Sequence, residues 1–389
     1  MTVCDVLVVG GTGRVGASTV QWLDRLSNRS RKGTPTLRIG IGGRSTTHFE
    51  AAKRRLGLQD LSFRHVDVDG ESQSLMAAIS DVKLVIHTAG PFQGRLNPTL
   101  LHACIKAGVP YCDVSDELLL SRNAKILSAE AAAAGIPAVI SCGIWPGVSA
   151  LMAATAVERM GGPGACDRVE LSFHTAGTGG AGPTIVSATF LLLATDVVTY
   201  QNGVLTHREP WTEQRIVDFG PGIGKHKCFL LDNPDVCSVA EALNIANCAS
   251  RFGSTPSIWN TLFGAMKALP RELLYDRSAM QVLAIVSMPV IRMVDALVGK
   301  TNAMRVDAYR RSDDGSSKQI TLRCVHSDLE DCVGQATAAF GMELLRGRVC
   351  TSMGKATIEP GVWYPAELQA AARNNILTVV KDNTLIWEM

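Results

Sequence analysis

Short apolar runs alternate with amphipathic or alanine-rich segments along the first 150 residues. The first run fits a strand that is buried on both faces, because its apolar side chains occupy consecutive positions. Six such runs are each predicted to contain a strand. They are Val6–Val9, Leu37–Ile41, 61–68 (LSFRHVDV), 82–90 (VKLVIHTAG), 108–117 (GVPYCDVSDE) and 136–143 (IPAVISCG). Helices that connect parallel strands form right-handed crossovers. The pattern therefore predicts an α/β fold with a doubly wound parallel sheet.

A glycine-rich loop follows the first run. It consists of Gly10, Gly11, Thr12, Gly13, Arg14, Val15 and Gly16, and the residues after it have helical spacing. Glycines let a pyrophosphate approach the backbone, and the start of a helix offers N–H groups to it. The order strand, glycines, helix predicts a Rossmann-type dinucleotide site.

The end of the second run indicates which dinucleotide is bound. An NAD site usually places Asp or Glu there for the ribose 2′-hydroxyl. This chain has Gly43, Arg44 and Ser45 instead. Because a guanidinium fork suits a phosphate, we expect NADP(H), with Arg44 and Ser45 on its 2′-phosphate. Asp67 and Val68, at the end of the third run, are expected to flank the adenine.

The second half of the chain has a different pattern. Residues 167–175 (DRVELSFHT) alternate apolar and polar side chains, which predicts a sheet with one covered face. Residues 304–327 predict a hairpin with Asp314-Gly315 at its turn. A helix over Leu329–Leu345 could cover this hairpin. These features predict a second, α+β domain with a mostly antiparallel sheet.

Residues 255–300 predict a helical insertion with unusually apolar faces. Packing within the insertion, a dimer interface, a wall for a hydrophobic substrate and peripheral contact with a membrane surface are all open. Pro289, Arg292 and Asp295 interrupt its most apolar part, 282–299, so no transmembrane helix is expected.

Composition narrows the class of protein. The chain has 389 residues, enough for two domains, and its 46% hydrophobic and 19% charged residues suit a globular protein. A formal net charge of +2 argues against binding to nucleic acid. The 11 cysteines show no zinc-type spacing, which predicts free thiols and no metal site. Free thiols are typical of a reducing compartment, so we expect a cytoplasmic location, or an organelle matrix or stroma if a transit peptide was removed.

No residue stands out as a proton donor. Each of the five tyrosines lacks a lysine four positions later, which argues against a short-chain dehydrogenase, and no HExxH or GxSxG motif occurs. The candidates at the carboxyl ends of the strands are Asp116 first, then Tyr111. Asp113, Glu117, His87 and His174 are weaker candidates, and each has an ordinary structural interpretation.

Five motifs in order resemble the saccharopine dehydrogenase-like family of NADP-binding oxidoreductases: GGTGRVG, GGRS, TAGPF, AGVPYCDVSDE and CGIWPGVSALMA. Weaker similarity continues at GTGGAGPTIVSATF and PGVWYPAEL. The resemblance implies an NADP-binding domain over 1–150 and a substrate and dimerisation domain over 151–349, with 350–389 packing back on the first. It also implies that the turn Ala89, Gly90, Pro91, Phe92 lies beside the nicotinamide.

The family contains saccharopine reductases, polyamine-pathway dehydrogenases and lipid-linked enoyl reductases, so membership leaves the substrate open. The arginines of the second half form no recognisable clamp for carboxylates. We therefore expect an NADPH-dependent reductase of a small, largely hydrophobic carbonyl or alkene compound. We also expect the protein to be a homodimer. The alternatives are a saccharopine-type amino-acid dehydrogenase and a non-catalytic NADPH-binding regulator or scaffold.

Overall fold

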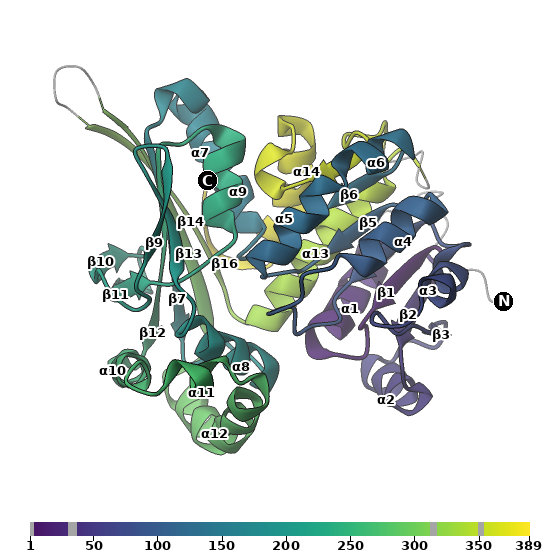
Figure 1. Cartoon of the computed structure of the whole chain (residues 1–389), viewed down its shortest axis with the longest axis horizontal. Helices are drawn as coiled ribbons and strands as arrows, with labels where there is room; N and C mark the ends of the chain where they lie inside the picture. The colour runs from purple at the N-terminus through teal and green to yellow at the C-terminus, as the bar shows by residue number, and fades with distance from the viewer. Residues whose placement is uncertain (1–3, 30–36, 312–316, 349–353) are drawn as a thin grey trace. The chain divides into compact units, whose positions relative to one another are not determined.

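The computed structural model describes residues 4–29, 37–311, 317–348 and 354–389 (Figure 1). The chain divides into two compact units. The first unit comprises Met1–Val148 and Glu330–Asp382, and the second comprises Ser149–Leu329 and Asn383–Met389. The chain therefore returns to the first unit earlier than the expected residue 350, and its last seven residues belong to the second unit.

The first unit is built on a parallel sheet that has seven strands in the described residues, in the order β15-β6-β5-β4-β1-β2-β3. This order and the all-parallel pairing confirm the predicted doubly wound sheet. Its strands are β1 (Val6–Val9), β2 (Ile39–Gly43), β3 (Ser62–His65), β4 (Leu84–His87), β5 (Tyr111–Asp113), β6 (Pro137–Val139) and β15 (Gly361–Trp363).

Helices cover both faces of this sheet. They are α1 (Arg14–Arg29), α2 (Thr46–Leu56), α3 (Ser72–Ile79), α4 (Thr99–Ala107), α5 (Leu118–Ile126), α6 (Ser128–Ala133), α13 (Leu329–Leu345) and α14 (Ala370–Lys381), with a short 3-10 helix at Pro365–Glu367. On one face, Leu7 and Val85 share a core with Leu75 of α3 and Leu101 of α4. Alternate strand residues face the opposite side, so both faces of the sheet are buried.

Helix α13 corrects one prediction. We expected it to cover the hairpin of the second half, but a Cβ added to Gly341 would lie 2.8 Å from the side chain of Ile86 in β4. The helix therefore lies directly on the parallel sheet of the first unit. Apolar periodicity shows that a helix is buried without showing which sheet it covers, and here the nearer partner in sequence was the wrong one.

The second unit is built on a mixed, mostly antiparallel sheet of nine strands in the described residues. These are β7 (Arg168–Ala176), β8 (Val197–Gln201), β9 (Val204–Arg208), β10 (Arg215–Asp218), β11 (Lys225–Leu230), β12 (Asn247–Thr255), β13 (Thr301–Arg311), β14 (Ser317–His326) and β16 (Thr384–Glu388). The predicted hairpin is β13 with β14, paired antiparallel. Its predicted turn, Asp314-Gly315, lies outside the described residues. The one parallel pair in this described sheet is β7 with β12.

The helices of this unit are α7 (Val148–Met160), α8 (Pro183–Leu192), α9 (Asp235–Leu243), α10 (Ser257–Met266), α11 (Arg271–Tyr275) and α12 (Arg277–Val298), with a 3-10 helix at Pro163–Ala165. The expected helical insertion is α10 to α12.

The polar face of β7 is covered, against expectation. Its side chains Glu170, Ser172 and His174 are all buried. The reason is that β10 and the residue after it lie over this face. Phe219 packs on His174 with ring centroids 5.6 Å apart, and Val217 and Phe219 share a small core with residues of β13 and β14. Alternation in β7 therefore separates an apolar face from a buried polar one.

Candidate functional site

Two glycines allow three elements to meet at the carboxyl end of β1. Gly10 has a φ of +85°, and a Cβ there would lie 2.6 Å from the backbone nitrogen of Ala89. A Cβ on Gly16 would collide with the carbonyl of Gly10 and would lie 2.6 Å from the hydroxyl of Thr88. Both positions exclude larger residues, so the loop, the start of α1 and the end of β4 stay in close contact.

The rest of the loop is open to a ligand. Gly13 and Arg14 are exposed, and Thr12 and Val15 are partly exposed. A Cβ on Gly13 would meet only the Gly10 carbonyl, at 3.3 Å. A concave backbone at the start of a 16-residue helix fits a pyrophosphate.

Arginines flank this loop. Arg44 follows β2, is exposed and has no ion pair with another described residue. Ser45 caps α2, where its hydroxyl accepts a hydrogen bond from the His48 N–H at 3.3 Å. Arg55, which sequence reasoning missed, donates from α2 to the Thr12 carbonyl at 3.1 Å. The basic run at the end of α2 was the only signal for it.

The connection after β3 holds the expected adenine neighbours. Asp67 accepts a hydrogen bond from the Asp69 N–H at 3.2 Å, and Val68 packs, partly buried, on the core. Asp69 forms an ion pair with Arg95, at 2.5 Å and 3.1 Å. Hydrogen bonding to Arg95 lowers the pKa of Asp69, and Arg44 adds to this effect.

The turn Ala89 to Phe92 follows β4. Thr88 holds its start by donating from its hydroxyl to the Val9 carbonyl at 2.9 Å. Ala89 is partly exposed, and Gly90 and Pro91 are exposed. Phe92 is buried, edge-on to His87 with ring centroids 5.1 Å apart. The turn thus presents backbone and small side chains outward.

His87 and Tyr111 form a buried pair beneath this turn. Nδ1 of His87 lies 3.0 Å from the Tyr111 hydroxyl, while its Nε2 has no hydrogen-bond partner among the described residues. Burial lowers the pKa of His87 to about 3 and raises that of Tyr111 well above its usual value. Both side chains are therefore neutral near pH 7. Of the two leading candidates for the proton donor, Tyr111 is less accessible to solvent than Asp116.

Asp116 lies in the next loop, after β5, and is partly exposed. Gln93 donates to its Oδ2 at 2.6 Å. Loss of hydration raises the pKa of Asp116 to about 6, and hydrogen bonds to the carboxylate limit the rise. The neighbouring Glu117 accepts from the Gly94 N–H at 2.8 Å and caps α5. These contacts tie the loops after β4 and β5 together.

The predicted cofactor residues thus lie in the loops after β1, β2, β3 and β4 and in the first turn of α1. Of the two predicted catalytic residues, Asp116 lies in the loop after β5, and Tyr111 is the first residue of β5. The structure adds Arg55, Gln93 and Arg95 to them. Within the described residues, no group of three or more His, Cys, Asp or Glu is placed to hold a metal ion.

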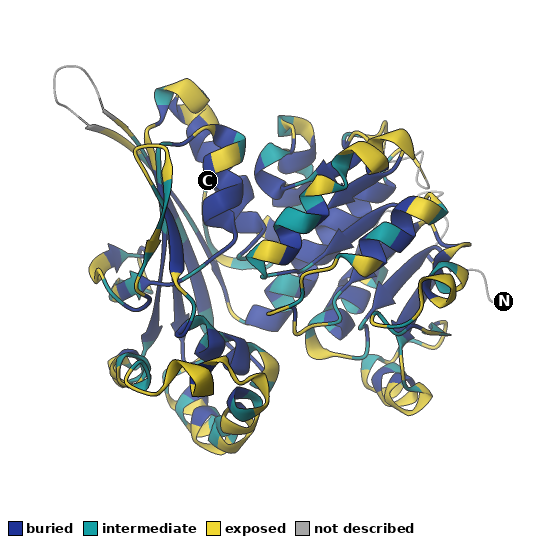
Figure 2. Cartoon of the chain, viewed as in Figure 1, coloured by how far each residue is buried: buried dark blue, intermediate teal, exposed yellow. Residues whose placement is uncertain are grey.

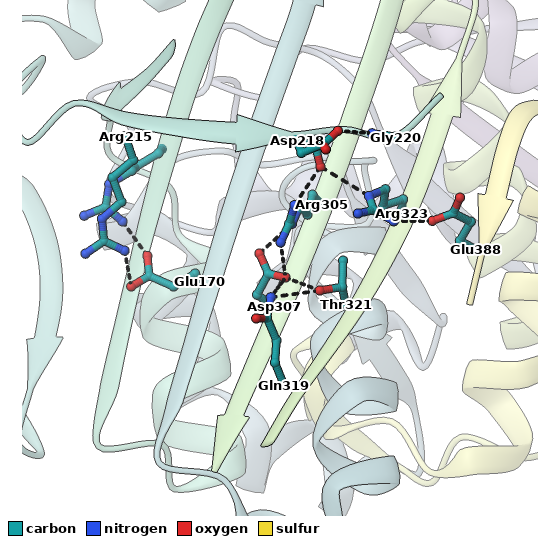
Figure 3. A network of polar contacts seen from close by, with 11 residues as sticks. Glu170, Arg215, Asp218, Gly220, Arg305, Asp307, Gln319, Thr321, Arg323 and Glu388 are labelled. Carbon is teal, nitrogen blue, oxygen red and sulfur yellow. Dashed lines mark hydrogen bonds and ion pairs between the residues drawn. The ribbon is translucent and has the colours of Figure 1, made fainter. Parts of the chain in front are cut away.

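In the second unit, arginines that look scattered in the sequence come together. Glu170 of β7 pairs with Arg215 of β10 at 2.8 Å (Figure 3). Glu170 also pairs with Arg251 of β12. Arg208 lies 3.7 Å from Glu213, which also contacts Arg251. A second network on the same sheet joins Asp218, Arg305, Asp307, Arg323 and Glu388 (Figure 3).

His174 is also part of this unit. Its ring stacks on that of His226 with centroids 3.8 Å apart, and its Nε2 lies 2.9 Å from the Thr255 hydroxyl. Burial, and then the charge of His226, lower its pKa to about 3. A proton at this site is therefore held weakly.

The glycine loop before α8 is held by α12. The backbone and hydroxyl of Thr178 both donate to Asp295, each at 2.8 Å. Asn302 donates to the Gly179 carbonyl at 3.0 Å. Asp295, which argued against a membrane span in the sequence, is buried and fixes this loop.

Helix α12 runs uninterrupted through Pro289. By length and composition alone it could cross a membrane, and 17% of its most apolar window is buried. Its exposed apolar residues include Val282, Val286, Val290, Met293 and Leu297. Figure 2 shows exposed positions along α10, α11 and α12.

Comparison with known proteins identifies the first unit. The family model of the saccharopine dehydrogenase NADP binding domain matches residues 6–139. Residues 6–139 belong to that domain family. The match confirms the resemblance and the predicted cofactor, NADP(H), and it covers both the glycine loop and the Asp116 loop of this NADP-binding domain.

Among curated proteins, the trans-acting enoyl reductases of Mycobacterium leprae and Mycobacterium bovis are 30% and 29% identical over 141 residues. The aligned part is 36% of this chain and 32% of each relative, so it spans about a third of their length.

Two solved structures share the fold. Saccharopine dehydrogenase (L-Glu forming) from Saccharomyces cerevisiae has a TM-score of 0.62 at 15% identity, covering 97% of both chains. The homospermidine synthase of Legionella pneumophila, in complex with NAD, has a TM-score of 0.62 at 11% identity, covering 99% of this chain and 90% of that one. Both confirm the pairing of the NADP-binding domain with a second, mostly antiparallel sheet.

Proposed function

We propose that the protein is an NADPH-dependent reductase of a small, largely hydrophobic carbonyl or alkene compound. The observation that carries this is the position of a carboxyl with raised pKa, Asp116, in a loop joined to the turn Ala89–Phe92 of an NADP-binding domain. The names of the mycobacterial relatives support a reductase. The apolar side chains of α10 to α12 support a hydrophobic substrate.

Bound NADPH would supply the hydride. The loop Gly10–Gly16 and the start of α1 would hold its pyrophosphate. Arg44, Ser45 and Arg55 would hold its 2′-phosphate, and the turn Ala89–Phe92 would bound the nicotinamide site.

Asp116 would then supply the proton. A reduction adds a hydride to one atom of the double bond and a proton to the other, so an acid is needed beside the second atom. Asp116 holds its proton to a higher pH than an exposed aspartate does, and Gln93 fixes the carboxyl at Oδ2.

The test is NADPH oxidation by the full chain with two substrate panels. One panel contains hydrophobic enones and aldehydes, and the other contains pairs of amino acids and keto acids. We expect turnover with the first panel, and loss of that turnover in Asp116→Asn. Turnover confined to the second panel would establish the amino-acid alternative. Tight NADPH binding without turnover on either panel would favour the regulator.

A further inference from the structure

The second unit contains a cavity of about 180 Å³. Residues of β7, β8, β9, β10 and β12 line it, among them Arg168, Glu170, Arg208, Arg215 and Arg251. One water molecule needs only ~10–15 Å³ of cavity volume. The cavity therefore has room for a small organic or inorganic molecule.

Two of its arginines are held in place by carboxylates. Arg251 has a side chain that is 2% exposed, and Glu170 and Glu213 both pair with it. Arg215 is half-exposed and donates to the other oxygen of Glu170 at 2.8 Å. Glu170 thus orients two guanidinium groups with a single carboxylate (Figure 3).

The other two arginines keep donors available. Arg208 makes one contact with Glu213, at 3.7 Å, which is longer than a hydrogen bond. Arg168 places its guanidinium 4.2 Å from the centre of the Tyr309 ring and forms no ion pair among the described residues. Four positive charges therefore face two negative ones around the cavity.

We propose that this cavity binds a small dianion that carries carboxylate or phosphate groups. The excess of two positive charges matches two negative charges on the ligand. Guanidinium forks bind both oxyanions in a bidentate manner. Because Glu170 and Glu213 already fix Arg251, the site is largely arranged before the ligand arrives. This proposal does not rest on the reductase reaction proposed above.

Isothermal titration calorimetry on the full chain tests the proposal. The dinucleotide site is first saturated with NADPH so that it cannot take up the probe. Inorganic phosphate and glutarate, both dianions at pH 8, are then titrated separately at that pH and at constant ionic strength. We expect saturable one-to-one binding of at least one probe, and the tighter probe identifies the ligand as a phosphate or a carboxylate.

Variants locate the binding. Arg168→Gln and Arg208→Gln should each weaken it by about 10- to 100-fold without altering NADPH binding. Arg271→Gln is the matched control, because Arg271 is an exposed arginine of the same unit that pairs with Asp196 outside the cavity. Its affinity for the probe should stay unchanged.

Glu213→Gln separates a binding site from a purely structural network. It removes a negative charge from the cavity, so the anion should bind severalfold more tightly. Absence of saturable binding at millimolar probe, or equal weakening in the Arg271→Gln control, would overturn the proposal. NADPH binding is measured in the same samples. If the chain does not bind NADPH, the reductase proposal is contradicted and the anion proposal is unaffected.

Discussion

At the scale of single residues, Asp116 differs from an ordinary surface aspartate in its pKa of about 6, raised by burial. The carboxyl keeps its proton below that pH and loses it as the pH rises. If Asp116 is the donor, kcat/KM should therefore fall as the pH increases through about 6. The pH profile of turnover on the best substrate measures this.

Asp116→Asn should remove this pH dependence and lower kcat by about 10²- to 10⁴-fold, the usual contribution of a general acid. Gln93→Ala should move the fall to higher pH, because Gln93 donates to the ionised form. Asp60→Asn, at an exposed aspartate, is the control. A profile that keeps its shape in Asp116→Asn would exclude Asp116 as the donor.

Arg44 should decide between the two dinucleotides. Arg44→Ala should weaken NADPH binding by about 10- to 100-fold, the effect of losing a charge-assisted contact, and should leave NADH nearly unchanged. Fluorescence titration of both cofactors measures this, with Arg54→Ala, in the following helix α2, as control. Equal or tighter binding of NADH to the unaltered chain would contradict the assignment.

Asp5 should make folding stability depend on pH. Burial opposes its ionisation, but hydrogen bonds from Arg38 and Lys83 outweigh burial and hold its pKa at about 2. Its stabilisation is therefore complete above the unfolded pKa near 4 and is lost as the pH falls towards 2. Asp5→Asn should cost roughly 1–2 kcal/mol of unfolding free energy at pH 7. Denaturation curves should show this difference shrinking towards pH 2; a constant difference would refute it.

The sequence predicts a residue's role where that role depends on elements that are adjacent in the chain. It misses roles that depend on the pairing of strands far apart in the chain. The glycine loop and Arg44 are recognisable because strand, loop and helix are adjacent in the chain. The contact of Arg251 with Glu170 follows from the pairing of β12 with β7, across 81 residues. Periodicity carries no information about such a pairing, so the cavity could not be expected.

At the scale of elements, α12 is apolar on both its buried and its exposed side. Val286→Glu should change the unfolding free energy by no more than about 0.5 kcal/mol, since Val286 is 69% exposed. Ala284→Glu should cost roughly 3 kcal/mol or more, since Ala284 is fully buried. Urea denaturation measures both, and similar costs for the two variants would contradict this orientation of the helix.

The same Val286→Glu variant bears on the homodimer and on peripheral membrane contact, which both stay predictions. Sedimentation velocity should show a smaller particle for the variant than for the unaltered chain if α12 joins two copies. Flotation with lipid vesicles should be lost in the variant if the helix contacts a membrane surface instead. If neither measurement differs between the variant and the unaltered chain, the exposed face of α12 has neither role.

At the scale of the molecule, each sheet takes a strand from near the end of the chain. β15 pairs with β6 in the first unit, and β16 pairs with β14 in the second. The motif PGVWYPAEL indicated that this segment packs on the NADP-binding domain, but a three-residue strand is too short for periodicity to reveal it.

A fragment of residues 1–148 should therefore fail to bind NADPH, because it lacks β15, α13 and α14. Circular dichroism should show a partly folded chain without a cooperative thermal transition. Co-expression with residues 330–382 should restore NADPH binding, and co-expression with residues 149–329 is the control. A fragment 1–148 that binds NADPH as tightly as the full chain would refute this dependence.

During synthesis on a ribosome, β6 emerges more than 200 residues before β15. At a translation rate of 5–20 residues per second, the nascent sheet waits roughly 10–40 s for its last strand. Through that interval β6 is an open edge, and such an edge can pair with a strand of another chain. The nascent protein should consequently depend on chaperones that shield this edge until its own carboxyl-terminal segment leaves the exit tunnel.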